Sequence, residues 1–424
     1  MRLNKVEIHN FKGIENCQLH FHDKMNLIIG GNGIGKTSIL EAIAVGLGGA
    51  ISGLNQVSTR NFKQDEIRIQ YEKIGDGSYN QKYITPVEVS CQAEFNGKEY
   101  EWKRTREAFN SSLNNSRTTM QPKQIAQDAN QLANEDSAIL PLINYQSVAR
   151  TWMQKLDAKE SSVVTKLLRT SGYRDCLSAV PRKKQIIAWC AKMEQISWQK
   201  GHPIGEYEGA KATVSKFMSL IEENHHCEIF YEKQSEELLY VKDGTAEAIS
   251  SLSAGYQSLI WMVFDIAYRM ALLNPFLRDR VSETPGIVLI DEPDTHLHPE
   301  WQWLLMGALQ QVFPNIQFIV ASHAPVVIAS VKKGQIIDIS SIEDIIYREP
   351  EYGLDINDTL CQVFESVDMP EEVAALQKKF YEAIDLGDMD SAKQIVTEIE
   401  TLIGNKPIAV EARTTYELET ALGD

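Results

Sequence analysis

The sequence predicts an α/β fold with a mainly parallel central sheet, an antiparallel β subdomain, a helical insertion and a C-terminal helical hairpin. Between residues 256 and 331, helical and strand-like segments alternate, which is typical of parallel sheets covered by helices. Near the start, the apolar run Met25–Ile29 leads into glycines and then into an amphipathic helical pattern. The 424 residues are 43% hydrophobic and 24% charged, which predicts a globular chain of two or three units and excludes a collagen-like or membrane-embedded one.

Strand-like segments dominate the first hundred residues. The expected elements are strands at Lys5–Phe11, Gln18–Phe21 and Met25–Ile29, a helix with Ile39, Leu40, Ile43, Ala44 and Leu47 on one face, and strands at Ile67–Tyr71, Val87–Phe95 and Glu99–Arg104. Residues 105–135 are rich in Asn, Ser, Thr and Gln, and we expect a polar loop with an exposed helix there.

The second half of the chain begins with a short apolar strand, Ile139–Tyr145. About three helices are expected between Trp152 and Glu223, as an insertion. The further expected elements are a hairpin of Cys227–Tyr231 and Glu237–Val241, helices at Tyr256–Leu273, Glu300–Val312 and Pro325–Val331, strands at Gly286–Ile290 and Gln317–Ala321, and a helical hairpin over Pro370–Leu402.

These elements divide the chain into four regions. They are the first half of one lobe with the β subdomain (1–104), a polar loop with the helical insertion (105–245), the second half of the lobe (246–345) and an acidic helical tail (346–424).

The net charge of −16 is concentrated at the C-terminal end. Residues 351–424 hold 17 acidic and 5 basic residues, a net charge of −12, so the remainder of the chain carries only −4. This charge gives no support to a nucleic-acid partner, although it does not exclude one. The six scattered cysteines, the absence of a signal-peptide pattern and the absence of a long apolar run predict a cytoplasmic protein with no membrane partner.

A phosphate-binding loop is predicted at Gly30-Gly31-Asn32-Gly33-Ile34-Gly35-Lys36-Thr37, which fits G-x-x-x-x-G-K-[ST] between a strand and a helix. Glycines let backbone N–H groups close around a polyanion, and the helix N-terminus adds partial positive charge. Lys36 can reach the β- and γ-phosphates, and the Thr37 hydroxyl can ligate Mg²⁺. We therefore expect ATP and Mg²⁺ as ligands. The loop residues expected to contact the nucleotide are Asn32, Gly33, Gly35, Lys36, Thr37 and Ser38.

Two carboxylates, Asp291 and Glu292, end the apolar strand that starts at Gly286. We expect Asp291 to hold Mg²⁺ and Glu292 to orient the attacking water. His323 ends a second apolar strand 32 residues after Asp291, where it could hydrogen-bond the γ-phosphate or the water. For His296 and His298 we expect a turn and helix-start role, because no third zinc ligand lies nearby in the sequence.

The segment Ser251-Leu252-Ser253-Ala254-Gly255-Tyr256-Gln257-Ser258 precedes a long amphipathic helix. It resembles the signature of ABC-type ATPases, and the order of phosphate loop, signature, Asp-Glu strand and histidine is similar to the SMC and RecF branch of the AAA-family ATPases. The resemblance covers roughly residues 1–50 and 245–345.

This resemblance implies a head-to-tail dimer in which the signature closes over the ATP of the partner. The residues it adds to the site are Ser253, Gly255 and Gln257 in the signature, Asp294 facing the opposite subunit, Lys12 of Asn10-Phe11-Lys12 near the nucleotide, and Gln146, the best match to a metal-binding Q-loop.

Residues 291–302 and 313–320, together with the acidic tail, resemble the PtuA-like ATPases of Septu and retron anti-phage defence systems. That resemblance implies a separate HNH-type effector nuclease, assembly of dimers into larger complexes, and a retron RNA–DNA or DNA as a partner. The segment 144–150 departs from the family's Tyr-Tyr-Gly-Thr-x-Arg pattern, which affects Gln146 and Arg150.

The function predicted from these features is an ATP-hydrolysing subunit that gates a partner nuclease in anti-phage defence. No carboxylate cluster on a strand pattern follows Lys333, so no nuclease activity is expected from this chain alone. The alternative is a RecF-like DNA-binding ATPase in DNA repair. Its candidate basic residues are Lys103, Arg104, Arg106, Arg182, Lys183 and Lys184. Two further hypotheses are a transporter's nucleotide-binding subunit and a protein that keeps ATP as a fixed structural ligand.

Overall fold

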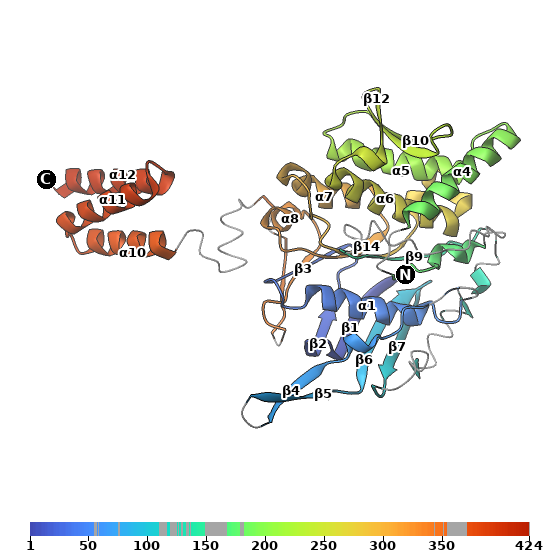
Figure 1. Ribbon diagram of the computed structural model, residues 1–424, viewed down its shortest axis with the longest axis horizontal. Coiled ribbons are helices and arrows are strands. Elements are labelled where there is room, and N and C mark those ends of the chain that lie inside the picture. Colours follow the sequence, from blue (N-terminus) through green and yellow to red (C-terminus); the bar gives the residue numbers. More distant parts are fainter. Residues whose placement is uncertain are drawn as a thin grey trace. The chain divides into compact units, whose positions relative to one another are not determined.

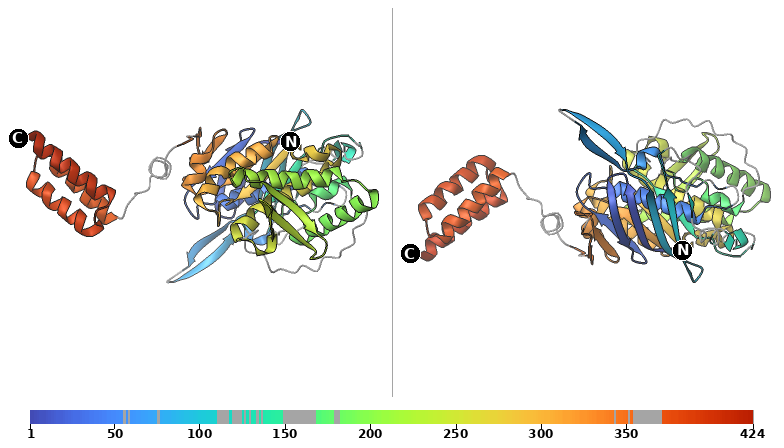
Figure 2. Two further views of the ribbon diagram at one scale, coloured as in Figure 1. Left: turned by 90° about the horizontal axis from the view of Figure 1, so that it is seen from above. Right: turned by 90° about the horizontal axis from the view of Figure 1, so that it is seen from below.

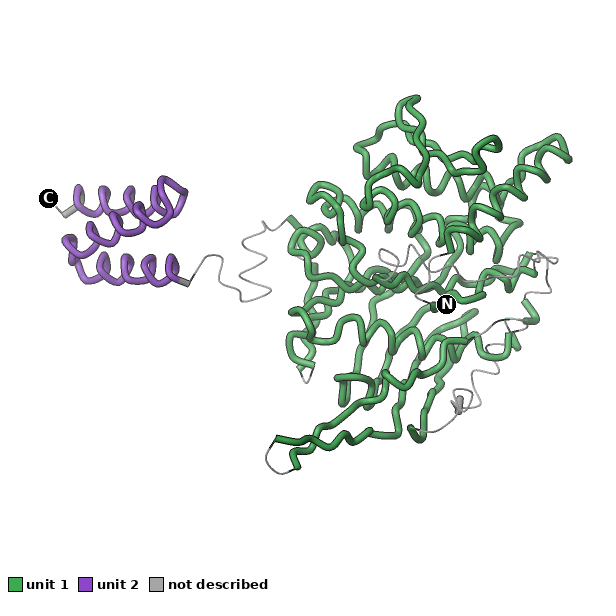
Figure 3. Tube along the Cα trace, in the orientation of Figure 1, with its two compact units in different colours: residues 1–353 green, residues 354–424 purple. Residues whose placement is uncertain are grey.

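The structure is a computed structural model, and it forms two compact units, Met1–Gly353 and Leu354–Asp424 (Figure 3). The residues that it describes are 1–54, 57, 59–74, 77–109, 117–118, 125, 127–128, 130–132, 135, 137–148, 168–178, 182–342, 344–350, 352–353 and 371–423. We describe the two units separately.

The central sheet of the first unit has six strands in the order β16-β15-β3-β14-β13-β9. Only the pairing of β16 with β15 is antiparallel. The strands are β3 (Met25–Ile29), β9 (Leu142–Gln146), β13 (Gly286–Asp291), β14 (Ile316–Ala321), β15 (Gln335–Asp338) and β16 (Ile346–Arg348). Every residue of β3, β9, β13 and β14 is buried, as expected for parallel strands covered on both faces.

A second, antiparallel sheet has the order β2-β1-β6-β7-β8. Its strands are β1 (Arg2–Phe11), β2 (Ile14–His20), β6 (Val87–Phe95), β7 (Lys98–Arg106) and β8 (Arg117–Thr118). Helix α1 (Lys36–Ala50) lies between this sheet and the central sheet and contacts β1, β6, β7, β13 and β14 (Figure 1). Because both sides of α1 pack on sheets, it is buried almost all round.

Two small β structures extend from this lobe. One is a two-stranded ribbon of β4 (Ile69–Ile74) and β5 (Ser78–Tyr83), which projects from the first unit (Figure 2). The other is a three-stranded sheet of β10 (Cys227–Glu232), β11 (Glu237–Lys242) and β12 (Thr245–Ala248).

The other helices among the described residues of the first unit lie on the side of the central sheet opposite α1 (Figure 1). They are α4 (Lys183–Lys200), α5 (Gly205–Ile221), α6 (Ala254–Leu273), α7 (Pro299–Val312) and α8 (Pro325–Ser330), with 3₁₀ segments η1 (Gln64–Glu66), η2 (Arg169–Tyr173), η3 (Ile249–Ser251) and η4 (Pro275–Glu283) between elements. In the parts of the chain described above, no helix has both the length and the hydropathy that a bilayer crossing requires.

Over its described residues, 371–423, the second unit consists of the helices α10 (Glu371–Asp385), α11 (Met389–Ile403) and α12 (Pro407–Gly423). It has its own apolar core around Phe380, Ala392 and Ile399, each with 0% of its surface exposed. Asp388 caps α11 by accepting a hydrogen bond from the Ser391 N–H at 3.1 Å.

The predicted fold class is confirmed, with differences in its minor elements. Helices α10 and α11, joined at Leu386-Gly387-Asp388, form the predicted hairpin, but a further helix, α12, follows it. Strands β5, β8, β12, β15 and β16 were not predicted, because they are short, polar or at an edge, and their pairing depends on neighbours. Much of the polar loop 105–135 and of the insertion before residue 168 lies outside the described residues.

Candidate nucleotide-binding site

The phosphate loop connects buried strand β3 to helix α1. Its backbone has positive φ at Gly30 (150°), Gly33 (80°) and Gly35 (113°). A Cβ on Gly33 would meet no atom within 4 Å, so backbone conformation rather than space requires glycine there. Successive N–H groups in such a turn, followed by a helix N-terminus, make an anion-binding concavity. The residues present therefore fit a triphosphate.

Lys36 folds back over this loop. Its Nζ donates hydrogen bonds to the carbonyl oxygens of Gly30 at 2.7 Å and Gly31 at 3.0 Å, and only 7% of the residue is exposed. Burial lowers the pKa of the ammonium group, and the negative charges of Glu292 and Asp291 oppose that shift. The cation is therefore held at the loop by two carbonyl oxygens and feels the negative charges of Glu292 and Asp291.

Thr37 and Asp291 meet at the carboxyl edge of the central sheet. The Thr37 hydroxyl donates to Asp291 Oδ1 at 3.2 Å, although the two residues are 254 positions apart. Asp291 has 0% of its surface exposed. A hydroxyl and a carboxylate are hard oxygen ligands of the kind that Mg²⁺ takes, usually together with water and phosphate oxygens. This pair therefore fits the predicted magnesium position.

Glu292 and His323 lie at the ends of the adjacent strands β13 and β14. Glu292 has φ 45°, and its backbone N–H donates to the Ala321 carbonyl oxygen at 2.9 Å. This turn brings Glu292 Oε1 to 3.9 Å from His323 Nδ1, with 31% and 46% of the two side chains exposed. Both groups can therefore contact a water molecule at the site.

Asp294 is held by a residue that the sequence reasoning did not include. The Ser322 hydroxyl donates to Asp294 Oδ1 at 2.7 Å and itself accepts from the Ala324 N–H at 3.1 Å. Asp294 is 6% exposed and Ser322 0%. Ser322 directly precedes His323 at a strand end, and this position is the only signal that could have identified it.

Lys12 is paired with Glu41, which lies one helical turn after Thr37 on α1. Arg60, also not predicted, contacts the same carboxylate group at 3.5 Å and Glu66 at 2.9 Å. Its guanidinium lies 5.5 Å from the centre of the Tyr145 ring, and Tyr145 directly precedes Gln146 in the sequence. An ion-paired cluster therefore joins the start of the chain to the first turns of α1.

The residues predicted to be the signature form the N-terminus of α6. Ser253 is the N-cap residue and is exposed. Gln257 Nε2 donates to the carbonyl oxygens of Leu252 at 2.8 Å and Ser250 at 3.1 Å, which shapes the preceding loop. At Gly255 a Cβ would lie 2.7 Å from the His296 carbonyl oxygen, so glycine permits contact with the turn after Asp294.

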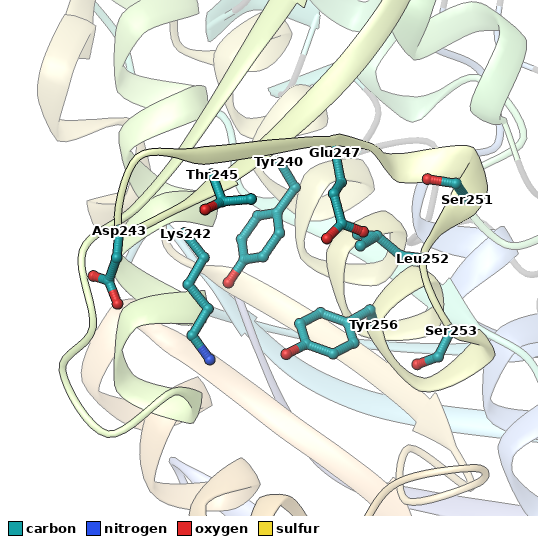
Figure 4. Close-up of a pocket in the computed structure, with 9 residues that line it drawn as sticks. All are labelled: Tyr240, Lys242, Asp243, Thr245, Glu247, Ser251, Leu252, Ser253 and Tyr256. Atoms are coloured by element: carbon teal, nitrogen blue, oxygen red, sulfur yellow. The ribbon is translucent and has the colours of Figure 1, made fainter.

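A cavity of about 450 Å³ lies beside the signature (Figure 4). Its walls come from β11, β12 and the start of α6, with Tyr240 and Tyr256 presenting their rings and Ser253 at one end. Lys242, which also lines it, is ion-paired with Glu222 at 2.5 Å. The signature serine is therefore at an accessible, hollowed surface.

The other predicted residues are distributed around these features. Asn32 and Gly33 are exposed on the loop, and Ser38 is half-buried in the first turn of α1. Gln146 ends β9 and pairs with Ile290 of β13, one position before Asp291. Arg150 lies outside the described residues. His296 has φ 66° and His298 is the N-cap of α7. These positions agree with the turn and helix-start roles expected for the two histidines.

Two of the candidate DNA-binding residues, Arg104 and Arg106, are buried and so cannot contact DNA in this structure. They are 2% and 3% exposed. Arg104 Nη1 donates to the Val45 carbonyl oxygen at 2.9 Å, and Arg106 Nη1 to that of Phe62 at 3.0 Å. Burial lowers the pKa of Arg104 to about 10. Through these hydrogen bonds the two side chains connect β7 to helix α1 and to the segment at Phe62.

Comparison with known proteins identifies the family. A family model described as an AAA domain matches residues 5–253, more than half of the chain. The chain belongs to this AAA-domain family. A second model, described as "AAA domain, putative AbiEii toxin, Type IV TA system", matches residues 203–329 of this AAA protein. The predicted family of ABC-type AAA ATPases is confirmed.

Among curated relatives, the Retron Vc95 probable ATPase of Vibrio cholerae is 26% identical to this AAA protein, over 93% of this chain and 85% of that one. The Septu protein PtuA of Bacillus thuringiensis is 21% identical over 81% and 76% of the two chains. The PtuA of Bacillus mycoides is 24% identical over 79% of this chain, which spans 40% of that relative. A solved SMC head bound to the C-winged helix domain of ScpA shares the fold, with a TM-score of 0.51 at 17% identity over 83% of this chain and 99% of that one.

Proposed function

We propose that this AAA protein binds and hydrolyses ATP with Mg²⁺, closes as a head-to-tail dimer around ATP, and thereby gates a separate HNH-type effector nuclease in anti-phage defence. The observation that carries the proposal is the meeting of Thr37 with Asp291 at 3.2 Å beside the folded phosphate loop. It supports a metal position next to the triphosphate position. The retron and Septu names of the relatives support the defence setting.

Each residue of the site has a proposed role. Lys36 exchanges the Gly30 and Gly31 carbonyl oxygens for β- and γ-phosphate oxygens, while Thr37 and Asp291 hold the metal. Bound Mg²⁺ would neutralise charge on the phosphates. Glu292 accepts a proton from the water as that water bonds to the γ-phosphorus and the bond to the β-phosphate oxygen breaks, giving ADP and phosphate.

His323 would hydrogen-bond the γ-phosphate or the same water. Its distance of 3.9 Å from Glu292 leaves both groups able to reach one water molecule. Lys12, through Glu41, would set the position of the first turns of α1 and so of Thr37. Gln146 would supply an amide oxygen to the metal from the neighbouring strand.

The dimer is proposed from the exposed signature. Ser253 and the N-terminus of the 20-residue helix α6 form an anion-binding surface. A γ-phosphate held by a second copy would satisfy it. Asp294 lies on the turn whose residue 296 contacts Gly255. Dimer closure at that turn would shift Asp294 and, through its hydrogen bond, Ser322 and the adjacent His323 of the same chain.

The acidic C-terminal region, with a net charge of −12 over residues 351–424, is the proposed docking surface for the effector. The described helices α10, α11 and α12, within residues 371–423, supply a folded surface with 11 acidic and 5 basic residues, a net charge of −6. Larger assembly of dimers and a retron RNA–DNA or DNA partner remain part of the proposal.

Nucleotide binding, turnover and ATP-dependent sedimentation of three variants test this function. Lys36→Ala should abolish ATP binding. Glu292→Gln should retain binding, accumulate dimer, and lose turnover by about 10²- to 10⁴-fold. Ser253→Arg should bind nucleotide as a monomer and fail to dimerise, whereas Ser235→Arg, at an exposed serine in the β10–β11 turn, should behave as wild type.

Wild-type turnover in Glu292→Gln, or unchanged ATP binding in Lys36→Ala, would refute the assigned chemistry. Dimerisation of Ser253→Arg with ATP would refute the composite site.

The alternative, a RecF-like DNA-repair ATPase, receives some support from a RecF protein of Phocaeicola vulgatus that is 31% identical over 26% of this chain and 28% of that one. The burial of Arg104 and Arg106 removes two of its candidate contacts. ATP-dependent binding of duplex DNA that weakens steeply with salt would favour it over the gating function.

A further inference from the structure

We infer that Asp265, on the signature helix α6, is a positioning residue that orients the Gln146 amide for the metal and ties that orientation to the signature. The inference rests on the proposed function, in which Gln146 supplies a metal ligand. Asp265 lies about three helical turns after Ser253, at 3.6 residues per turn, on the same continuous helix.

One oxygen of Asp265 collects three donors. Its Oδ2 accepts from Gln146 Nε2 at 2.8 Å, Asn144 Nδ2 at 2.8 Å and Arg269 Nε at 3.0 Å. Gln146 and Asn144 belong to β9, whereas Asp265 and Arg269 belong to α6. The cluster therefore connects the sheet edge of the metal position directly to the signature helix.

The hydrogen-bonding capacities of these groups determine which way each amide points. An ionised carboxylate can only accept, so both Asn144 and Gln146 must present nitrogen to Asp265. The Asn144 oxygen then accepts the second N–H of Gln146 at 2.7 Å. With both N–H groups of Gln146 engaged, its amide oxygen is directed to the other side of the group. Gln146 is paired with Ile290, so it stands beside the strand end that carries Asp291.

The Asp265 carboxylate is held by a fixed cation. Arg269 Nε donates to its Oδ2 at 3.0 Å, and Arg269 Nη1 donates to the carbonyl oxygens of Gly172 at 2.8 Å and Arg174 at 3.0 Å. A carboxylate that receives a hydrogen bond from a fixed guanidinium acts as an acceptor toward its other neighbours as well.

The second oxygen of Asp265, Oδ1, is buried and has no hydrogen-bond partner within the portion of the chain that the structure describes. Leaving a buried acceptor unsatisfied is costly, so such a group calls for a physical explanation. A positioning role for the carboxylate is one explanation that fits its contacts.

Placement on α6 gives the cluster a second consequence. The helix starts at the signature tip, so a displacement of Ser253 when a second copy docks would be carried along the helix to Asp265. That movement would change the orientation of Gln146 and hence the metal ligands. Metal binding in each protomer would then respond to closure on its own signature face.

The test exchanges the donor and acceptor between the two side chains and uses Mn²⁺ as the metal probe. Free Mn²⁺ is measured by electron paramagnetic resonance with the full chain and a non-hydrolysable ATP analogue. Gln146→Glu places a carboxylate against Asp265, so its metal-binding oxygen is turned away. We expect Mn²⁺ affinity to fall by about tenfold or more, despite the added negative charge. Asp265→Asn should weaken Mn²⁺ binding by a similar factor, because the amide no longer determines which atom Gln146 presents.

The double variant Asp265→Asn with Gln146→Glu restores a donor facing an acceptor and should recover most of the wild-type affinity. An effect that acted only through space, by charge, would instead be additive. Leu259→Ala is the matched control, because Leu259 is fully buried on the same helix, and its loss should lower the melting temperature without changing Mn²⁺ affinity.

Mn²⁺ affinity in Gln146→Glu equal to or above wild type, or a double variant no better than the single ones, would overturn this inference. If Asp265→Asn does not fold, Gln146→Glu alone still decides. Failure of the wild-type chain to bind the ATP analogue would instead refute the proposed function, which separates the two results.

Discussion

Substitution of Gly49 by alanine tests how tightly α1 is held between the two sheets. A Cβ at this position would lie 2.7 Å from both Cδ1 and Nε1 of Trp102, and 3.2 Å from Arg104 Cδ. Ordinary carbon contacts are about 3.5–4.0 Å, so the indole would have to shift by roughly 0.8 Å or more. Trp102 is 1% exposed, and its indole N–H donates to the Gly46 carbonyl oxygen at 2.8 Å, so a shift would disturb that bond.

Two opposing effects set the size of the change. Alanine favours a helix over glycine by about 1 kcal/mol. Overpacking a buried position costs about 1–3 kcal/mol, and weakening a buried hydrogen bond adds up to about 1 kcal/mol. We therefore expect Gly49→Ala to destabilise the first unit by about 1–2 kcal/mol. Gly307→Ala on α7 is the matched control, because its Cβ would meet no atom within 4 Å, and we expect a gain of about 0.5–1 kcal/mol.

Thermal unfolding measures both changes. Since 1 kcal/mol corresponds to about 2–4 °C in domains of 150–250 residues and to less in longer ones, Gly49→Ala should lower the melting temperature by a few degrees. Gly307→Ala should raise it by a degree or two. Because α1 begins at the phosphate loop, Gly49→Ala should also weaken ATP binding. A melting temperature for Gly49→Ala at or above that of Gly307→Ala would refute the packing argument.

Two further predictions concern the site. Burial lowers the pKa of Lys36 in the nucleotide-free protein, and a bound triphosphate would raise it. Above the lowered pKa, ATP binding must therefore be accompanied by uptake of a proton. ATP affinity should fall as the pH rises through the lowered pKa. Calorimetry in buffers of different ionisation enthalpy measures this, and constant affinity up to the ordinary lysine pKa contradicts it. Ser322→Ala removes the 2.7 Å hydrogen bond to the Asp294 carboxylate and should lower the free energy of unfolding by about 1.5–3 kcal/mol. The same variant should reduce ATP turnover more than it reduces ATP binding. Ser330→Ala is its control, because that buried hydroxyl donates only to the Val327 carbonyl oxygen of its own helix; equal effects of the two variants would exclude a special role for Ser322.

The sequence by itself was sufficient for the features whose chemistry is local. The eight residues from Gly30 to Thr37 contain the whole phosphate loop, because a strand, a glycine turn and a helix start are adjacent in the chain. The predicted signature at the start of α6 and the carboxylates at the end of β13 are likewise patterns of adjacent residues. Apolar runs also identified the buried parallel strands, since strands covered on both faces need apolar side chains throughout.

Tertiary structure alone decided which of these groups meet. The contacts between Thr37 and Asp291, and between Asp265 and Gln146, join residues 254 and 119 positions apart, and no local pattern encodes such pairings. Arg104 is polar in sequence yet buried, because the carbonyl oxygens of Val45 and Arg60 replace its water. The short strands β15 and β16 exist because neighbouring strands complete their hydrogen bonds. Local propensity is a property of adjacent residues, whereas burial, pairing and the orientation of an amide depend on elements that only the folded chain brings together.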